Sequence, residues 1–119
     1  MMTSTDLLAW GIVAHVVADW LFQNDWIAVN KPKLWSSPAG WIHGLHHFFT
    51  LSFVFHWLTA LALAGVHIWI DTRTPLVFVR QRLGQGKEGN PVATHVAIWH
   101  DQVVHVVSIA IAALLTARG

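Results

Sequence analysis

The sequence predicts an all-α protein, a polytopic bundle of four short transmembrane helices, on three observations. Of the 119 residues, 55% are hydrophobic and only 11% are charged, whereas ordinary soluble domains carry about 25% charged residues. Four apolar segments are long enough for short spans and are separated by polar or proline-containing connections. Eight residues are tryptophan, which concentrates at membrane interfaces. We therefore expect one transmembrane domain over residues 1–119.

The first predicted span covers about residues 7–23. No basic residues precede it and no small-residue cleavage site follows it, so we predict a retained helix and not a signal peptide. A polar, Trp-rich connector follows. Ser37 and Pro38 then have the chemistry of an N-cap and a first helical residue, which predicts the start of the second span.

The apolar run over 41–70 would be about 45 Å long as one helix, well beyond a hydrocarbon core of about 30 Å. We prefer two spans, about 38–55 and 57–73, with a turn near His56 and Trp57; the alternative is one overlong, tilted helix. With four spans, six of the seven basic residues lie on one side of the membrane, as the positive-inside rule requires. Arg118 alone lies on the other side.

Residues 75–83 carry Arg80 and Arg82 among apolar side chains, which is typical of a segment lying along the interface. A loop containing Lys87 leads to the last span, about 94–116, and His95, at this boundary, is predicted to be a loop residue. We predict a multi-pass protein of the inner (plasma) membrane, with basic connections in the cytoplasm and both termini opposite. Its predicted partner is the lipid bilayer, and a net charge of +1 gives no indication of nucleic acid.

Histidines and carboxylates collect at the cytoplasmic ends of the predicted spans. Three pairs, His15/Asp19, His67/Asp71 and Asp101/His105, have four-residue spacing, which places both members on one helix face. Inside a bundle this arrangement suits a first-row metal ion. The predicted ligands are His15, His46, His67 and His105; Asp19, Asp71 and Asp101 are further ligands or general bases; Gln23, His43, His47 and Gln102 support them.

Zinc is the preferred ion and iron the alternative, and the absence of cysteine excludes thiolate sites. Such a centre would activate water to attack a lipid-like or phosphate-containing substrate. Carboxylates inside a membrane need counter-charges, for which the sequence offers the histidines, a metal ion or Arg73.

Three other interpretations stay open. The cluster can be a metal-free hydrogen-bond network in a non-catalytic subunit of a larger membrane complex. His43, His46 and His47 match one histidine box of membrane di-iron desaturases, although the companion box is missing. Haem or a bacteriochlorophyll-type pigment can be ligated by a membrane histidine, and Gly11 leaves room beside His15. Tetrapyrroles, however, do not require carboxylates one turn from each histidine.

The whole pattern resembles a domain-of-unknown-function family, numbered 3307, of small polytopic membrane proteins from bacteria and phages. The resemblance covers Leu7 to about Ser108 and implies a membrane bundle without implying an activity. It is carried by His15-x3-Asp19-Trp20-x2-Gln23, then Lys31 or Lys33, His43 or His46, His67-x3-Asp71, and Asp101-Gln102-x2-His105.

Overall fold

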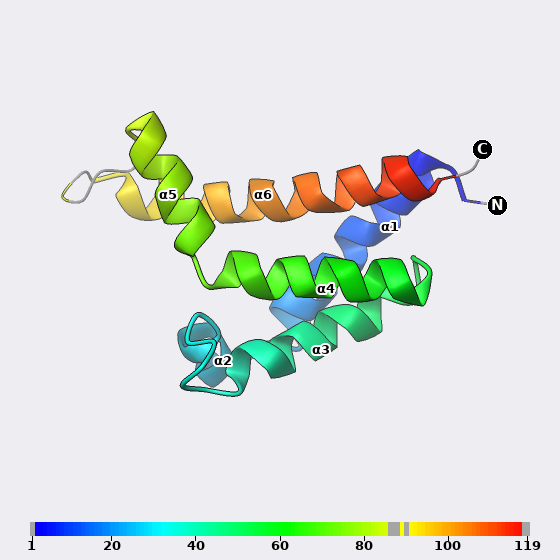
Figure 1. Ribbon diagram of the computed structural model, residues 1–119, viewed down its shortest axis with the longest axis horizontal. Coiled ribbons are helices and arrows are strands. Elements are labelled where there is room, and N and C mark those ends of the chain that lie inside the picture. The colour runs from blue at the N-terminus through cyan, green and yellow to red at the C-terminus, as the bar shows by residue number, and fades with distance from the viewer. Residues whose placement is uncertain (1, 86–88, 90, 118–119) are drawn as a thin grey trace.

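The computed structural model describes residues 2–85, 89 and 91–117, and the regular structure in this part of the chain is helical throughout (Figure 1). The predicted all-α class is confirmed. The elements are α1 (Ser4–Val16), the π-helical η1 (Val17–Leu21), α2 (Asp25–Asn30), α3 (Ala39–Leu51), α4 (Trp57–Asp71), α5 (Thr74–Leu83) and α6 (Ala93–Thr116).

The chain turns between α3 and α4, so the prediction of two helices in the long apolar run is confirmed. The backbone N–H of Phe55 donates to the Leu51 carbonyl at 2.8 Å, which closes the turn. His56 then caps α4, because its ring Nδ1 accepts from the N–H of Leu58 at 3.3 Å. A single overlong helix is therefore excluded.

Four transmembrane spans are not supported by the helix lengths. Among the described helices, only one stretch, His95–Thr116, is both long and apolar enough to cross a membrane. Trp57–Asp71 is apolar but has 15 residues, and α1 and α3 have 13 each. Helix α3 ends in turns after Leu51, and α1 changes to the π-helical η1 after Val16, so both α-helices are shorter than the spans predicted for them.

The polar connector contains α2, a helix that was not predicted from the sequence; its first turn is capped by Asn24 Oδ1 accepting from the Ile27 N–H at 2.9 Å. Two local predictions need correction. His95 lies in α6 and not in a loop. Helix α3 begins at Ala39, one residue later than predicted, because Pro38 is its N-cap and not its first helical residue; Ser37 Oγ accepts from the Ala39 N–H at 3.3 Å. The predictions made on Lys87 and Arg118 lie outside the described residues.

The four longer helices α1, α3, α4 and α6 form the bundle (Figure 1). Both chain ends and the turn between α3 and α4 lie at one end of it, while α2 and α5 lie at the other. The end near the termini holds an apolar core that includes Leu7, Leu51, Phe55 and Ile109. The opposite end holds a polar core, described below.

Burial in this bundle is the reverse of that in a water-soluble protein. The largest fully buried side chains are His43, His47 and His105, whereas all eight tryptophans are exposed. Soluble proteins hide their large apolar side chains and leave histidine intermediate. The polar core is therefore the feature that this fold encloses.

Candidate metal centre

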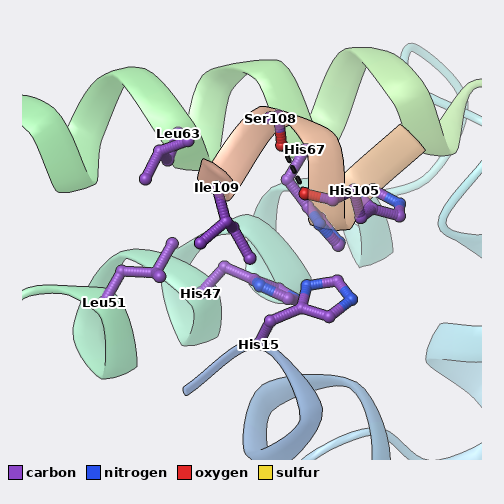
Figure 2. Close-up of a pocket in the computed structure, with 8 residues that line it drawn as sticks. All are labelled: His15, His47, Leu51, Leu63, His67, His105, Ser108 and Ile109. Atoms are coloured by element: carbon purple, nitrogen blue, oxygen red, sulfur yellow. Dashed lines mark hydrogen bonds between the residues drawn. The ribbon is translucent and has the colours of Figure 1, made fainter. Parts of the chain in front are cut away.

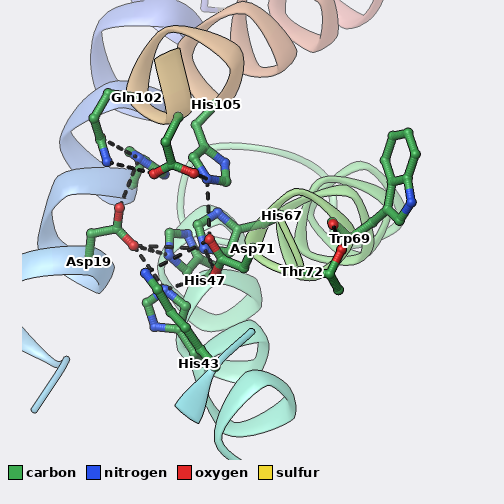
Figure 3. Close-up of polar contacts among 12 residues, drawn as sticks. Asp19, His43, His47, His67, Trp69, Asp71, Thr72, Gln102 and His105 are labelled. Atoms are coloured by element: carbon green, nitrogen blue, oxygen red, sulfur yellow. Dashed lines mark hydrogen bonds and ion pairs between the residues drawn. The ribbon is translucent and has the colours of Figure 1, made fainter. Parts of the chain in front are cut away.

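Eight side chains from five elements meet in the polar core, which we call the His/Asp cluster (Figure 3). Helix α1 contributes one, η1 one, α3 two, α4 two and α6 two. The two residues from each of α3, α4 and α6 are four positions apart, so they lie on one face of their helix and point into the bundle together. The members are His15, Asp19, His43, His47, His67, Asp71, Asp101 and His105.

Asp19 is the first of two carboxylates around which the histidines gather. The Nε2 atoms of His43 and His47 lie 2.9 and 3.0 Å from Asp19 Oδ1. The Nε2 atom of His15 lies 3.2 Å from Oδ2, and that of His67 lies 3.7 Å from Oδ1. Asp19 lies in η1, and π-helical turns are frequent at functional sites.

Asp71 is the second such carboxylate. Its Oδ2 lies 2.8 Å from His67 Nε2 and 3.6 Å from His43 Nε2. Its Oδ1 lies 3.4 Å from His105 Nε2 and 3.8 Å from the Lys31 ammonium. The two carboxylates thus share His43 and His67, which lie between them.

Helix α6 closes the cluster with a third carboxylate and an amide. Asp101 Oδ1 lies 3.4 Å from His105 Nε2. The Gln102 amide donates to Asp101 Oδ2 at 3.2 Å, and its carbonyl oxygen lies 3.4 Å from His15 Nε2. Asp101 is the most accessible of the three carboxylates, with a side chain 26% exposed against 6% for Asp19 and 3% for Asp71.

Several polar atoms of the cluster are buried without a hydrogen-bond partner among the described residues. They include His67 Nε2, Asp71 Oδ2 and His105 Nε2. His67 and Asp71 approach to 2.8 Å, but their geometry does not meet the criteria of a hydrogen bond. Buried polar atoms in folded proteins are almost always satisfied. Imidazole nitrogens and carboxylate oxygens that face one another in this way can serve together as ligands of a metal ion.

The donor atoms form three groups in which all members lie within 4.8 Å of one another. Two of these groups share no residue. We call His15, Asp19, His47 and His67 the four-donor set, and Asp71, Asp101 and His105 the three-donor set. The third group, His43, His67 and Asp71, connects them.

One family of known proteins matches almost the whole chain. The family described as protein of unknown function (DUF3307) matches residues 7–118. The chain belongs to this DUF3307 family. This confirms the resemblance seen in the sequence, and the family description supplies no activity. No curated protein and no solved structure matches the chain.

In this DUF3307 protein, a cavity of about 490 Å³ adjoins the three-donor set. Asp71 and Asp101 lie in its wall, together with Asp19. We call it the charged cavity, because its wall also contains the cationic side chains of Lys31, Arg73 and Arg80. On the apolar side of the cluster, the hollow lined by His15 and Leu63 has only about 10 Å³ (Figure 2), about enough for one water.

The structure brings together the three His/Asp pairs that the spacing predicts, with one difference in α3. Of the predicted ligands, His46 lies outside the cluster, half-buried, with its ring 5.7 Å from that of Phe22. His43 and His47, predicted to support the site, are inside it. Residues 43 and 47 are one turn apart on a helix, and residue 46 points to a neighbouring face.

The two predicted glutamines lie at different distances from the cluster. Gln102 contacts His15 and Asp101, as given above, whereas Gln23 lies beyond the end of η1 and lines the charged cavity. Among the described residues, Arg73 forms no ion pair with the carboxylates. The ionisable side chains that contact these carboxylates are the imidazoles and the Lys31 ammonium.

Sequence reasoning did not assign Lys31 and Arg80 to the site. For Lys31 a signal existed, because the family pattern contains a lysine at residue 31 or 33. The structure selects Lys31, since Lys33 instead donates to Asn30 Oδ1 at 3.1 Å.

Proposed function

We propose that this protein is an integral membrane protein whose bundle binds divalent metal ions, foremost zinc with iron as the alternative, in the His/Asp cluster. The observation that carries the proposal is the convergence of five imidazoles and three carboxylates with buried donor atoms that lack hydrogen bonds. Metal-dependent hydrolysis of a lipid-like substrate is the activity that this centre suits best.

Membrane insertion is supported by what the bundle exposes. Leu114, Leu115 and Phe53 are at least 72% exposed, and all eight tryptophans are on the surface. Large contiguous apolar surfaces are rare on soluble monomers. The rest of the bundle buries only 17% of the apolar window in His95–Thr116, which distinguishes this helix from the core helix of a soluble protein.

We propose that the bundle crosses the membrane four times, with α1 and η1 together, α3, α4 and α6 as the spans. A helix of 15 residues such as α4 is about 22 Å long, so the bilayer must thin around the bundle. The described basic residues, Lys31, Lys33, Arg73, Arg80 and Arg82, precede α3 or follow α4. They would lie on the cytoplasmic side of the inner membrane.

Two ions account for the donors better than one. Zinc in proteins takes four ligands when its role is structural, and three plus a water when it is catalytic. The four-donor set supplies the four protein ligands that a structural zinc ion takes. The three-donor set leaves one position for water, and two of its residues, Asp71 and Asp101, line the charged cavity.

The reaction that fits is ester hydrolysis. A metal ion in the three-donor set would lower the pKa of its water. Asp101, the most accessible carboxylate of the cluster, would hold the metal ion through one oxygen and take one proton through the other as the water oxygen bonds to the electrophilic atom of the ester. The proton would pass to the departing oxygen when the ester bond breaks, which gives an acid and an alcohol.

Elemental analysis of the full chain, purified in detergent without added metal or chelator, tests the proposal. We expect two equivalents of zinc or iron per chain. Less than a tenth of an equivalent of any transition metal, before and after incubation with zinc, would overturn it.

One observation favours a metal-free network in a subunit of a larger complex: Asp19 is already contacted by three imidazoles within 3.2 Å. A tetrapyrrole has less support, because Ile109 and Phe55 occupy the space beside Gly11. An absorption spectrum of the same sample without a Soret or Q band would exclude it.

A further inference from the structure

We propose that the charged cavity binds a phosphate group through Arg73 and Arg80, with Lys31 as a third cation. The inference rests on the proposed function, since it names the chemical class of the substrate, a phosphate ester, for the same site. The geometry points to it because the cavity joins a cationic wall to the three-donor set.

The cations and carboxylates of this cavity are not equivalent. Asp19, Asp71 and Asp101 each lie within 3.4 Å of at least one imidazole. Within the part of the chain that the structure describes, neither Arg73 nor Arg80 forms an ion pair, and Arg80 Nε is buried without a hydrogen-bond partner. The guanidiniums are the groups with unused hydrogen-bonding capacity.

Arg73 also has an unusual backbone. Its φ of 65° is the only positive value among the described non-glycine residues. Glycine adopts this conformation freely, whereas an L-residue with a long side chain does so at a cost. The residue separates α4 from α5 and its side chain lines the cavity. Glycine would satisfy the backbone geometry of this turn at lower cost. We therefore infer that the arginine is present for its guanidinium.

A phosphate group is the ligand that these side chains recognise best. Arginine presents a planar fork of donors that matches phosphate oxygens in pairs, and lysine adds a point charge. The first turn of α5 borders the cavity through Leu76, and the positive end of a helix dipole also attracts anions. A volume of about 490 Å³ lies in the range of small-molecule sites.

The phosphate can belong to a lipid headgroup or to a soluble compound, and the rim of the cavity bears on this choice. Trp20 and Ile98 line the cavity and are 70% and 51% exposed. An apolar rim beside a cationic interior would accept a phospholipid from the bilayer.

The test is isothermal titration of the full chain in detergent, loaded with zinc and freed of excess metal, with two probes. The probes are inorganic phosphate and dihexanoyl phosphatidic acid, a short-chain phosphate monoester lipid. We expect both to bind. Tighter binding of the lipid identifies a headgroup, and equal binding identifies a soluble phosphate.

The decisive variant is Arg73→Asn combined with Arg80→Gln, since asparagine tolerates the left-handed backbone. We expect at least a tenfold increase in the Kd for phosphate, with unchanged helicity and metal content. Arg82→Gln is the matched control, because Arg82 lies on the same helix with its guanidinium 5.1 Å from the Phe78 ring centroid. It should change the Kd less than twofold.

Absence of binding by both probes, or an equal loss in Arg82→Gln and the double variant, would overturn the inference. Metal content separates its failure from that of the proposed function. Two equivalents of zinc without phosphate binding would contradict the phosphate site alone. Phosphate binding without metal would overturn the proposed function and leave the phosphate site standing.

Discussion

The imidazoles of His47 and His67 stack with their centroids 3.5 Å apart and their planes inclined by 26°. Two cationic rings at this separation would repel by about 5 kcal/mol at an effective dielectric constant of about 20. At least one ring of the pair is therefore neutral and has a nitrogen lone pair available. Both residues belong to the four-donor set, so their stacking keeps a donor ready for a metal ion.

Replacing His67 by alanine should remove metal. His67 lies in two of the three donor groups and 2.8 Å from Asp71, so we expect His67→Ala to lose at least half of the bound metal. His46→Ala is the matched control, because His46 lies on α3 outside every donor group. It should retain the metal content of the unmodified chain.

Stability should separate the same two variants. Removing the His67 imidazole leaves the buried Asp71 carboxylate without its nearest partner, and an unsatisfied buried polar group costs about 1–3 kcal/mol. His67→Ala should therefore melt earlier than His46→Ala in detergent. If His67→Ala destabilises the fold while metal content stays at the unmodified value, the cluster is a structural network.

The two donor sets should be separable by a change at Asp101. Asp101→Asn removes a ligand charge from the three-donor set and leaves the four-donor set intact. We expect elemental analysis to give one equivalent of metal in place of two. Asp25→Asn, at an exposed carboxylate in α2, should keep both ions. Loss of all metal from Asp101→Asn would instead indicate a single ion held by both sets.

Local periodicity was sufficient to predict the three His/Asp pairs. Four-residue spacing places side chains on one helix face regardless of what surrounds the helix, and His67/Asp71 and Asp101/His105 meet for that reason. His15 and Asp19 also stay together, although the chain changes to π-helical geometry between them. The overall all-α class likewise follows from apolar segments and the breaks between them.

The rotation of α3 could not be predicted in this way. Whether His46 or His43 and His47 face the cluster depends on how α3 packs against α4. That packing is set by Gly44, where an added Cβ would collide with the Ile68 side chain. Such a contact joins residues far apart in sequence, and periodicity within one helix does not report it.

Lys31 reaches the cluster through the contact between the end of α2 and the start of α3. The Lys31 carbonyl packs on Gly40, within 2.7 Å of where a Cβ would lie. The short helix α2 before it was missed because six residues carry little periodicity. Asn24 followed by Asp25 was the available signal, since asparagine is a preferred N-cap and an acidic residue suits the first turn.

These close contacts predict a graded effect of glycine-to-alanine changes on stability. In Gly44→Ala the obstacle is the flexible end of Ile68, and overpacking of this kind costs about 1–3 kcal/mol. In Gly40→Ala the obstacle is a backbone carbonyl, so we expect the upper end of that range and displacement of Lys31 from Asp71. Thermal melting in detergent measures both.

Gly65→Ala is the control for this series. Apart from its chain neighbours and the surrounding turns of its own helix, no atom of the described residues lies within 4 Å of the added Cβ, and alanine in a helix is about 0.5–1 kcal/mol more favourable than glycine. Its melting temperature should equal or exceed that of the unmodified chain. A Gly40→Ala variant as stable as Gly65→Ala would contradict the packing of α2 and its C-cap against α3.

Labelling of introduced cysteines tests the membrane arrangement, because the chain has no cysteine of its own. Lys33 and Gln85 are exposed and lie in the connections that follow α2 and α5; Ser52, directly after α3, and Thr116, the last residue of α6, are also exposed. The turn after α3 and the end of α6 lie at the end of the bundle opposite α2 and α5 (Figure 1). In sealed vesicles, an impermeant maleimide should label Lys33→Cys and Gln85→Cys from the cytoplasmic side. It should label Ser52→Cys and Thr116→Cys only from the other side. Labelling of all four from one side would show that the bundle does not cross the membrane, and its exposed tryptophans would then have to be covered by another protein surface.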